Sequence, residues 1–181
     1  MHIYCWNIRG LNSPLKQHEV ANLMKKNGID VCCFLETKFA LYKLQFMHRF
    51  RLKNWKFLSN LDVARYARIV VFWNPATVDI ELLAVSEQGL HVSIRCLVSH
   101  LEFVATFVYG LNTITARRGL WNDLRQWLLQ CLGLSWVTST PFSLSRTSIM
   151  VNLSCCLIWS YYGLFCFEHG TCCWVQRLMI R

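Results

Sequence analysis

Apolar and polar side chains alternate over residues 3–8, which is the period of a half-buried β-strand. Polar and glycine residues at 9–12 then predict a turn. A second strand is predicted at residues 30–35, where an unbroken apolar run lies between polar residues. Such a run is typical of a strand that is buried on both faces.

The segment between these two strands has the period of a helix. Ser13 and Pro14 are a typical N-cap and first-turn pair, and Asn27 and Gly28 provide a stop signal. The apolar face of this predicted helix consists of Val20, Leu23 and Met24. The chain is therefore predicted to begin with a β-α-β unit.

The pattern downstream predicts two more helices and a series of strands. Residues 38–50 predict a helix whose basic side chains face solvent. The β-rich runs that follow predict an antiparallel meander attached to the first unit. These runs are residues 55–58, 68–73, 78–85, 90–98 and 103–109. Helical spacing returns at residues 115–129, with an inner face of Leu120, Leu124, Trp127 and Leu128. This order of elements indicates an α+β protein.

From about residue 133 the pattern loses its period. Residues 135–148 are rich in Ser and Thr, and residues 149–167 form an uncharged, mainly apolar run. Its length is close to that of a membrane-spanning helix. Three polar residues dilute the run, so a membrane segment is kept only as an alternative; they are Asn152, Ser154 and Ser160.

Composition limits the classes that fit. An apolar content of 54% is sufficient for a packed core, which excludes disorder over most of the chain. The net charge of +9 favours a polyanionic partner such as nucleic acid or an acidic membrane surface. The first residues lack the pattern of a secretion signal, so we expect the ten cysteines to be reduced thiols in an intracellular protein. Adjacent cysteine pairs without C-x-x-C spacing argue against a zinc site.

Three short motifs lie at the ends of predicted strands. They are residues 6–10 (WNIRG), 35–37 (LET) and 108–112 (VYGLN). In this order and spacing they resemble the endonuclease/exonuclease/phosphatase superfamily. Residues 6–15 and 117–128 resemble most the endonuclease domains of LINE-type (non-LTR) retrotransposons of plants. The resemblance covers residues 1–136, which correspond to the N-terminal half of such a domain.

The resemblance implies an incomplete four-layer, DNase-like α/β sandwich with a two-sheet core that lacks its C-terminal strands. It also implies a Mg²⁺-dependent endonuclease that cleaves DNA in the nucleus and uses no small-molecule cofactor. Glu36 would be the Mg²⁺ ligand, because Mg²⁺ takes oxygen ligands from one or two carboxylates and water. In the absence of the other motifs, Glu36 would be interpreted as a solvated carboxylate at a strand end.

The resemblance assigns roles to five further residues. Asn7 would orient the attacking water or the metal ligand, and Tyr109 would donate a hydrogen bond to a phosphate oxygen. Taken alone, these two are a turn asparagine and a strand aromatic. Contacts with the DNA backbone are implied for Asn112, Arg117 and Arg118. A helix start with solvated arginines explains the last three equally well.

The basic segment 38–56 contains interleaved aromatic residues, which are Tyr42, Phe46, Phe50 and Trp55. This pattern suits nucleic-acid binding, but it is more typical of an amphipathic helix whose aromatics lie in the core, and we predict the latter.

The second half of the family pattern is absent from this chain. A Gly-Asp-Phe-Asn strand end, a later Asp and a terminal Ser-Asp-His are all missing, and eight of the ten acidic residues lie at or before Glu102. Only Glu168 and His169 remain as candidates, in an unrelated context. We therefore expect an inactive remnant of an endonuclease. A non-catalytic basic fragment that binds nucleic acid is the alternative, and salt-dependent DNA binding without cleavage would distinguish it.

The genetic code offers a reason for the missing motif. Trp136 is encoded by TGG and the Val137 codon begins with GT, so the frame that starts at the last base of the Trp136 codon encodes Gly. Permitted codons for residues 137–140 then complete Gly-Asp-Phe-Asn-Ser in that frame. We therefore predict a frameshift between about residues 129 and 136, with residues 137–181 forming a poorly ordered tail. The sheet that should be covered by the lost strands would expose apolar area.

Overall fold

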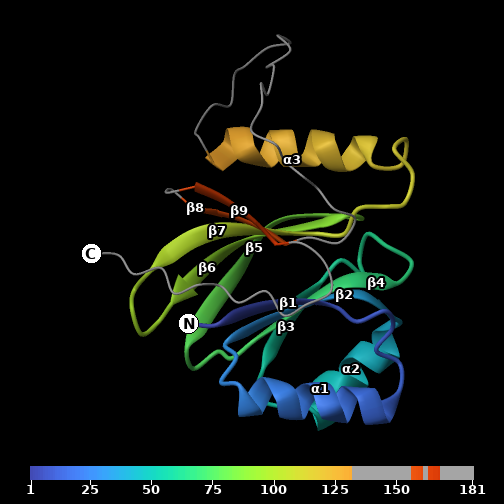
Figure 1. Ribbon diagram of the computed structural model, residues 1–181, viewed down its shortest axis with the longest axis vertical. Helices are drawn as coiled ribbons and strands as arrows, with labels where there is room; N and C mark the ends of the chain where they lie inside the picture. The colour runs from blue at the N-terminus through green and yellow to red at the C-terminus, as the bar shows by residue number, and fades with distance from the viewer. Residues whose placement is uncertain (132–155, 161–162, 168–181) are drawn as a thin grey trace.

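Four layers make up the part of the chain that the computed structural model describes, which is residues 1–131, 156–160 and 163–167. Two helices cover one sheet, a second sheet lies on the other face of the first, and the third helix covers the second sheet (Figure 1). The outer helices are α1 (Pro14–Lys26), α2 (Leu41–Phe50) and α3 (Arg118–Cys131).

The first sheet contains the predicted β-α-β unit. Its strands, in the order β1-β2-β4-β3, are β1 (Ile3–Asn7), β2 (Val31–Phe39), β4 (Ala67–Trp73) and β3 (Lys56–Ser59). The β1 and β2 strands are parallel and are connected through α1, whereas β4 is antiparallel to both β2 and β3. The sequence prediction for this unit is confirmed.

The second sheet begins with an antiparallel meander and has the order β5-β6-β7-β8-β9. Its strands are β5 (Val78–Ser86), β6 (Gly89–Cys96), β7 (Glu102–Val108), β8 (Cys156–Ser160) and β9 (Gly163–Phe167). The single meander predicted from the sequence is therefore divided between two sheets, because β4 pairs with β2 and β3 and not with β5. Apolar periodicity identifies a strand but not the edge at which it pairs.

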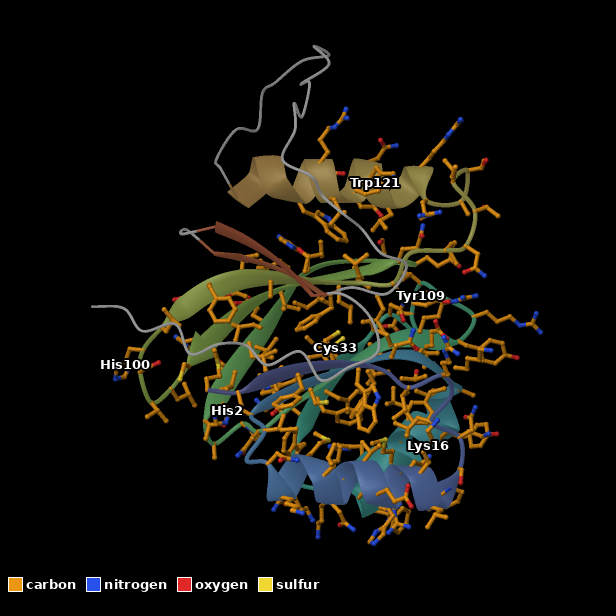
Figure 2. All side chains as sticks on the ribbon, viewed as in Figure 1. His2, Lys16, Cys33, His100, Tyr109 and Trp121 are labelled. Carbon is orange, nitrogen blue, oxygen red and sulfur yellow. The ribbon has the colours of Figure 1, made fainter. Side chains whose placement is uncertain are left out.

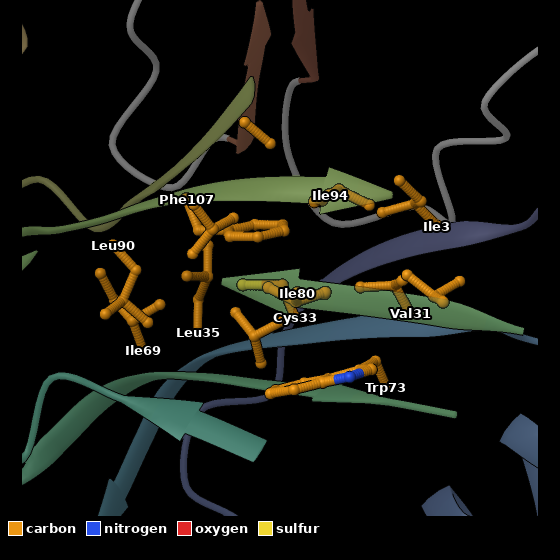
Figure 3. Packing of buried hydrophobic residues seen from close by; sticks show 14 of the residues in the cluster. Ile3, Val31, Cys33, Leu35, Ile69, Trp73, Ile80, Leu90, Ile94 and Phe107 are labelled. Atoms are coloured by element: carbon orange, nitrogen blue, oxygen red, sulfur yellow. The ribbon is translucent and has the colours of Figure 1, made fainter. Parts of the chain in front are cut away.

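The main core lies between the two sheets, and side chains of both sheets interdigitate there (Figure 3). Cys33 and Leu35 of β2 point into this core, whereas Cys32 and Phe34 point into a second core beneath α1 and α2. Both faces of β2 are thus buried, which explains its unbroken apolar run. Of the sequence-predicted inner residues of α1, Val20 and Met24 belong to the second core, whereas Leu23 is only partly buried.

Two local expectations need correction. Ser13 occupies the N-cap position of α1, but its side chain makes no capping hydrogen bond. The helix predicted from residue 38 begins at Leu41, because β2 continues through Phe39 and pairs there with Ala67.

The C-terminal region contains elements that were not predicted. Strands β8 and β9 pair with each other, and β8 pairs with β7. Most of the range predicted for the frameshift, and most of the expected tail, lie outside the described residues. Among the residues that are described, no helix has the length and apolar character needed to cross a membrane.

Candidate functional site

Asn7 and Glu36 meet where the parallel strands β1 and β2 approach their carboxyl ends. The register places Asn7 beside Leu35, so its side chain reaches the next residue of β2. The Asn7 Nδ2 group donates a hydrogen bond of 2.9 Å to Oε1 of Glu36. Both residues are partly buried.

The backbone around this pair is held in an unusual conformation. Glu36 and Lys38 have φ angles of 57° and 53°, and Arg9 has 45°. Only one other non-glycine residue in the described part of the chain has a positive φ, so these conformations concentrate at the site. Such residues cost about 1–3 kcal/mol each and persist where the surroundings impose them.

Three hydrogen bonds hold the backbone in this conformation. The Gly10 N–H donates to the Glu36 carbonyl at 2.7 Å, and the Leu11 N–H donates to the Thr37 carbonyl at 3.1 Å. Thr37 is fully buried, and its hydroxyl donates to the Ala67 carbonyl of β4 at 2.5 Å. Glu36 is therefore presented on a rigid bulge between two neighbouring strands.

Lys16 fixes the turn that follows β1. Its ammonium group donates to the carbonyls of Ile8 at 2.6 Å and Gly10 at 3.0 Å. Lys16 reaches the turn from the first part of α1, and Figure 2 shows Lys16 and Tyr109 at the same end of the two sheets, opposite His100.

Tyr109 follows β7 and lies under a cation from the first sheet. Tyr109 is 8% exposed, and the Arg68 guanidinium lies 5.4 Å from the centre of its ring. Arg68 precedes Ile69, which pairs with Leu35 of β2, so this arginine connects Tyr109 with the strand end that carries Glu36. The structure brings Asn7 and Glu36 into direct contact and places Tyr109 at the same end of the sandwich.

Sequence reasoning missed Arg68, Lys16 and Gln88. Gln88 is buried, and its amide braces the loop after Tyr109 by accepting from the Leu111 N–H at 2.8 Å and donating to the Ala116 carbonyl at 2.9 Å. A lysine, arginine or glutamine carries no sequence signal for such a role. The roles of Arg68 and Gln88 depend on which strands lie side by side, and that of Lys16 depends on how the start of α1 lies against the turn after β1.

Three residues, Asn112, Arg117 and Arg118, were predicted to contact the DNA backbone. They lie in the loop after Tyr109 and at the start of α3. Asn112 and Arg118 are exposed. Arg117 is partly buried against Gly110, and its guanidinium donates to the carbonyls of Asn112 and Thr113 at 3.4 Å. Arg117 therefore orders the loop, while Arg118 is open to solvent.

The donor set fits the ligand preference of Mg²⁺. Glu36 offers one anchored carboxylate, and the described residues contain no group of three or more His, Cys, Asp or Glu side chains that could hold a metal. Mg²⁺ keeps several water ligands and binds through one or two carboxylates together with substrate phosphate. The site fits that chemistry and not a metal cage made only of protein ligands.

Comparison with known proteins agrees with this architecture. No family model matches the chain. An endonuclease/exonuclease/phosphatase family protein from Bacteroides thetaiotaomicron is similar over 76% of this chain and 58% of its own, with a TM-score of 0.56 and 16% identity. The chain has a DNase-like fold. The endonuclease domain of TRAS1, a telomere-specific non-LTR retrotransposon, is similar over 69% of this chain and 52% of its own, with a TM-score of 0.51 and 12% identity. This DNase-like chain thus spans little more than half the length of either structure.

Proposed function

We propose that this chain is the first part of a Mg²⁺-dependent DNA endonuclease domain of a plant LINE-type retrotransposon, and that it is inactive as it stands. The observation that carries the proposal is the hydrogen bond between Asn7 and Glu36 at the ends of two parallel strands. The DNase-like fold and the motif resemblance support the same ancestry.

In this proposal Glu36 holds the Mg²⁺ ion, and the Asn7 amide fixes one carboxylate oxygen in place. When bound, the ion would neutralise negative charge on the phosphodiester. The Tyr109 hydroxyl donates a hydrogen bond to a phosphate oxygen, and the Arg68 guanidinium adds positive charge beside it. The DNA backbone contacts Asn112 and Arg118, whose side chains are exposed.

The expected inactivity follows from the residues that the chain lacks. The resemblance assigns water activation and transition-state binding to an Asp, an Asn and a His in motifs that are absent from this sequence. Removing members of a catalytic unit costs factors of about 10³ to 10⁶ in rate. Glu36 and Tyr109 alone do not supply those functions.

Binding of Mn²⁺, a paramagnetic substitute for Mg²⁺, tests the Glu36 site. We expect the full chain to reduce the electron paramagnetic resonance signal of free Mn²⁺ weakly, and Glu36→Gln to remove most of that effect. Glu81→Gln is the matched control, because Glu81 is an exposed carboxylate on β5. Equal Mn²⁺ binding by Glu36→Gln and the unchanged chain would remove the basis of the proposed site.

A plasmid assay tests inactivity. Supercoiled DNA incubated with Mg²⁺ and the full chain should remain unnicked, while a gel shift should show binding that weakens as salt is raised. Nicking that disappears in Glu36→Gln would show that the chain is an active nuclease and that the predicted loss is wrong. DNA binding without Mn²⁺ binding would favour the non-catalytic alternative.

A further inference from the structure

The outward face of α2 carries large apolar side chains exposed to solvent. We define this aromatic face by four residues with their exposed fractions, which are Leu41 (55%), Tyr42 (67%), Phe46 (43%) and Phe50 (60%). The sequence prediction that these aromatics lie in the core is wrong for the three rings of α2. The core positions of the helix are taken by Leu44 and Met47.

The three rings form a row along the helix. They follow at intervals of four residues, so neighbouring positions rise by about 6 Å. The rings of Phe46 and Phe50 already contact each other, with centroids 4.7 Å apart and planes inclined by 41°. Contiguous exposed apolar surface of this kind marks an interaction site.

The charged side chains of the segment that carries the row are all basic. Between Glu36 and Asp62 the chain carries six Lys or Arg residues and no Asp or Glu. Two of these cations lie next to the rings: the Lys43 ammonium is 5.8 Å from the centre of the Tyr42 ring, and the Arg49 guanidinium is 5.7 Å from that of Phe50. The face therefore complements a partner that is both aromatic and anionic.

We propose that the aromatic face of α2 binds single-stranded nucleic acid. Exposed bases stack on aromatic rings in a sequence-tolerant manner, while cations beside the rings pair with phosphates. In a duplex the faces of the bases are stacked inside the helix. A duplex can therefore present only its phosphates to the aromatic face of α2. An amphipathic helix that lies on a membrane is the competing interpretation, but three of the four exposed apolar residues are aromatic and only Leu41 is aliphatic. The inference does not depend on the Glu36 site.

Fluorescence anisotropy of the full chain with labelled oligothymidine tests this inference. The oligonucleotide should have about 20 nucleotides, because single-strand sites cover about 4–16. The variant with Tyr42→Ser, Phe46→Ser and Phe50→Ser should bind at least about tenfold more weakly, since loss of one base stack costs about 5- to 150-fold. Trp121→Ser is the control, because Trp121 is an exposed aromatic on α3. This variant should bind oligothymidine with unchanged affinity.

Four further measurements decide between the interpretations. A duplex of the same length should lose far less affinity in the triple variant, and Arg49→Gln should reduce the salt dependence of oligothymidine binding. Circular dichroism should show an unchanged fold in the triple variant, because the replaced rings are exposed. Unchanged oligothymidine affinity in that folded variant would overturn the proposal. So would ring-dependent binding to phosphatidylserine vesicles without ring-dependent binding to oligothymidine.

Discussion

Gly89 is a position whose residue type is constrained by a side chain from another element of the fold. It begins β6, and a Cβ at this position would lie 2.8 Å from two ring carbons of Trp127. Trp127 is buried and stacks on His91, with ring centroids 5.2 Å apart. The Trp127 ring therefore cannot move away from position 89 without weakening the packing of α3 on the second sheet.

Replacing Gly89 with alanine should lower the free energy of unfolding by about 1–3 kcal/mol, as expected for an overpacked site. Gly119→Ala is the matched control, because nothing lies within 4 Å of a Cβ at this position in α3. That control should raise stability by up to about 1 kcal/mol through helix propensity. Urea denaturation followed by circular dichroism measures both. A Gly89→Ala protein as stable as the unchanged chain would show that Trp127 is free to move.

Particular residues show how much of the site the sequence contained. Asn7 and Glu36 were predictable as neighbours, because both follow apolar strand residues and parallel strands end at the same edge. The position of Arg68 over Tyr109 was not predictable, because it depends on the pairing of β4 with β2. The exposure of Phe46 was equally hidden, because α2 has two apolar stripes and helical period alone does not decide which one faces the sheet.

At the scale of elements, the packing of α3 on the second sheet centres on His91. This histidine is 6% exposed, shares a 2.8 Å hydrogen bond between its Nδ1 and the Thr106 hydroxyl, and stacks on Trp127. Burial lowers the pKa of His91 below its ordinary value of 6.5. The folded protein therefore favours the neutral imidazole.

This pKa shift predicts the direction in which stability depends on pH. In the unfolded chain His91 takes up a proton as the pH falls through 6.5, whereas in the folded chain it does so at a lower pH. Its contribution to stability is thus complete above pH 6.5 and is lost as the pH falls toward the lowered pKa. Urea midpoints measured from pH 8 to pH 5 should fall less steeply for His91→Gln than for the unchanged chain. Parallel pH profiles would contradict this role of His91.

Elements also differed in how well their partners could be predicted. The burial of β2 on both faces followed from its apolar run, and the parallel pairing of β1 and β2 followed from the helix between them. The division of the later strands between two sheets did not follow from the sequence. The sequence of the turn from β4 to β5, residues 74–77, does not reveal that the chain passes there from one sheet to the other.

At the scale of the whole molecule, Asn60 connects the two sheets by hydrogen bonds. Its side chain is fully buried. The Oδ1 atom accepts from the N–H groups of Arg68 and Ile69 at 3.0 and 3.1 Å, and Nδ2 donates to the Glu87 carbonyl at 2.7 Å. Arg68 belongs to the first sheet, whereas Glu87 lies in the turn between β5 and β6 of the second.

Asn60→Ala should lower the free energy of unfolding by about 1–3 kcal/mol, because it leaves buried backbone groups without partners. Asn54→Ala is the control, since Asn54 is exposed and should tolerate the change. Denaturant titration compares the stabilities, and hydrogen exchange should show faster exchange at Arg68 and Ile69 in the Asn60 variant alone. Equal stability of the two variants would mean that water replaces this bridge.

The left-handed backbone at Glu36 and Lys38 also bears on how the gene will diverge. Glycine adopts φ angles of 57° and 53° without steric cost, whereas other residues are strained there. Copies that are still selected to fold, but no longer to keep this carboxylate, should therefore accumulate glycine or asparagine at positions 36 and 38. Copies that retain glutamate at position 36 across many lineages would instead carry the mark of purifying selection for its carboxylate.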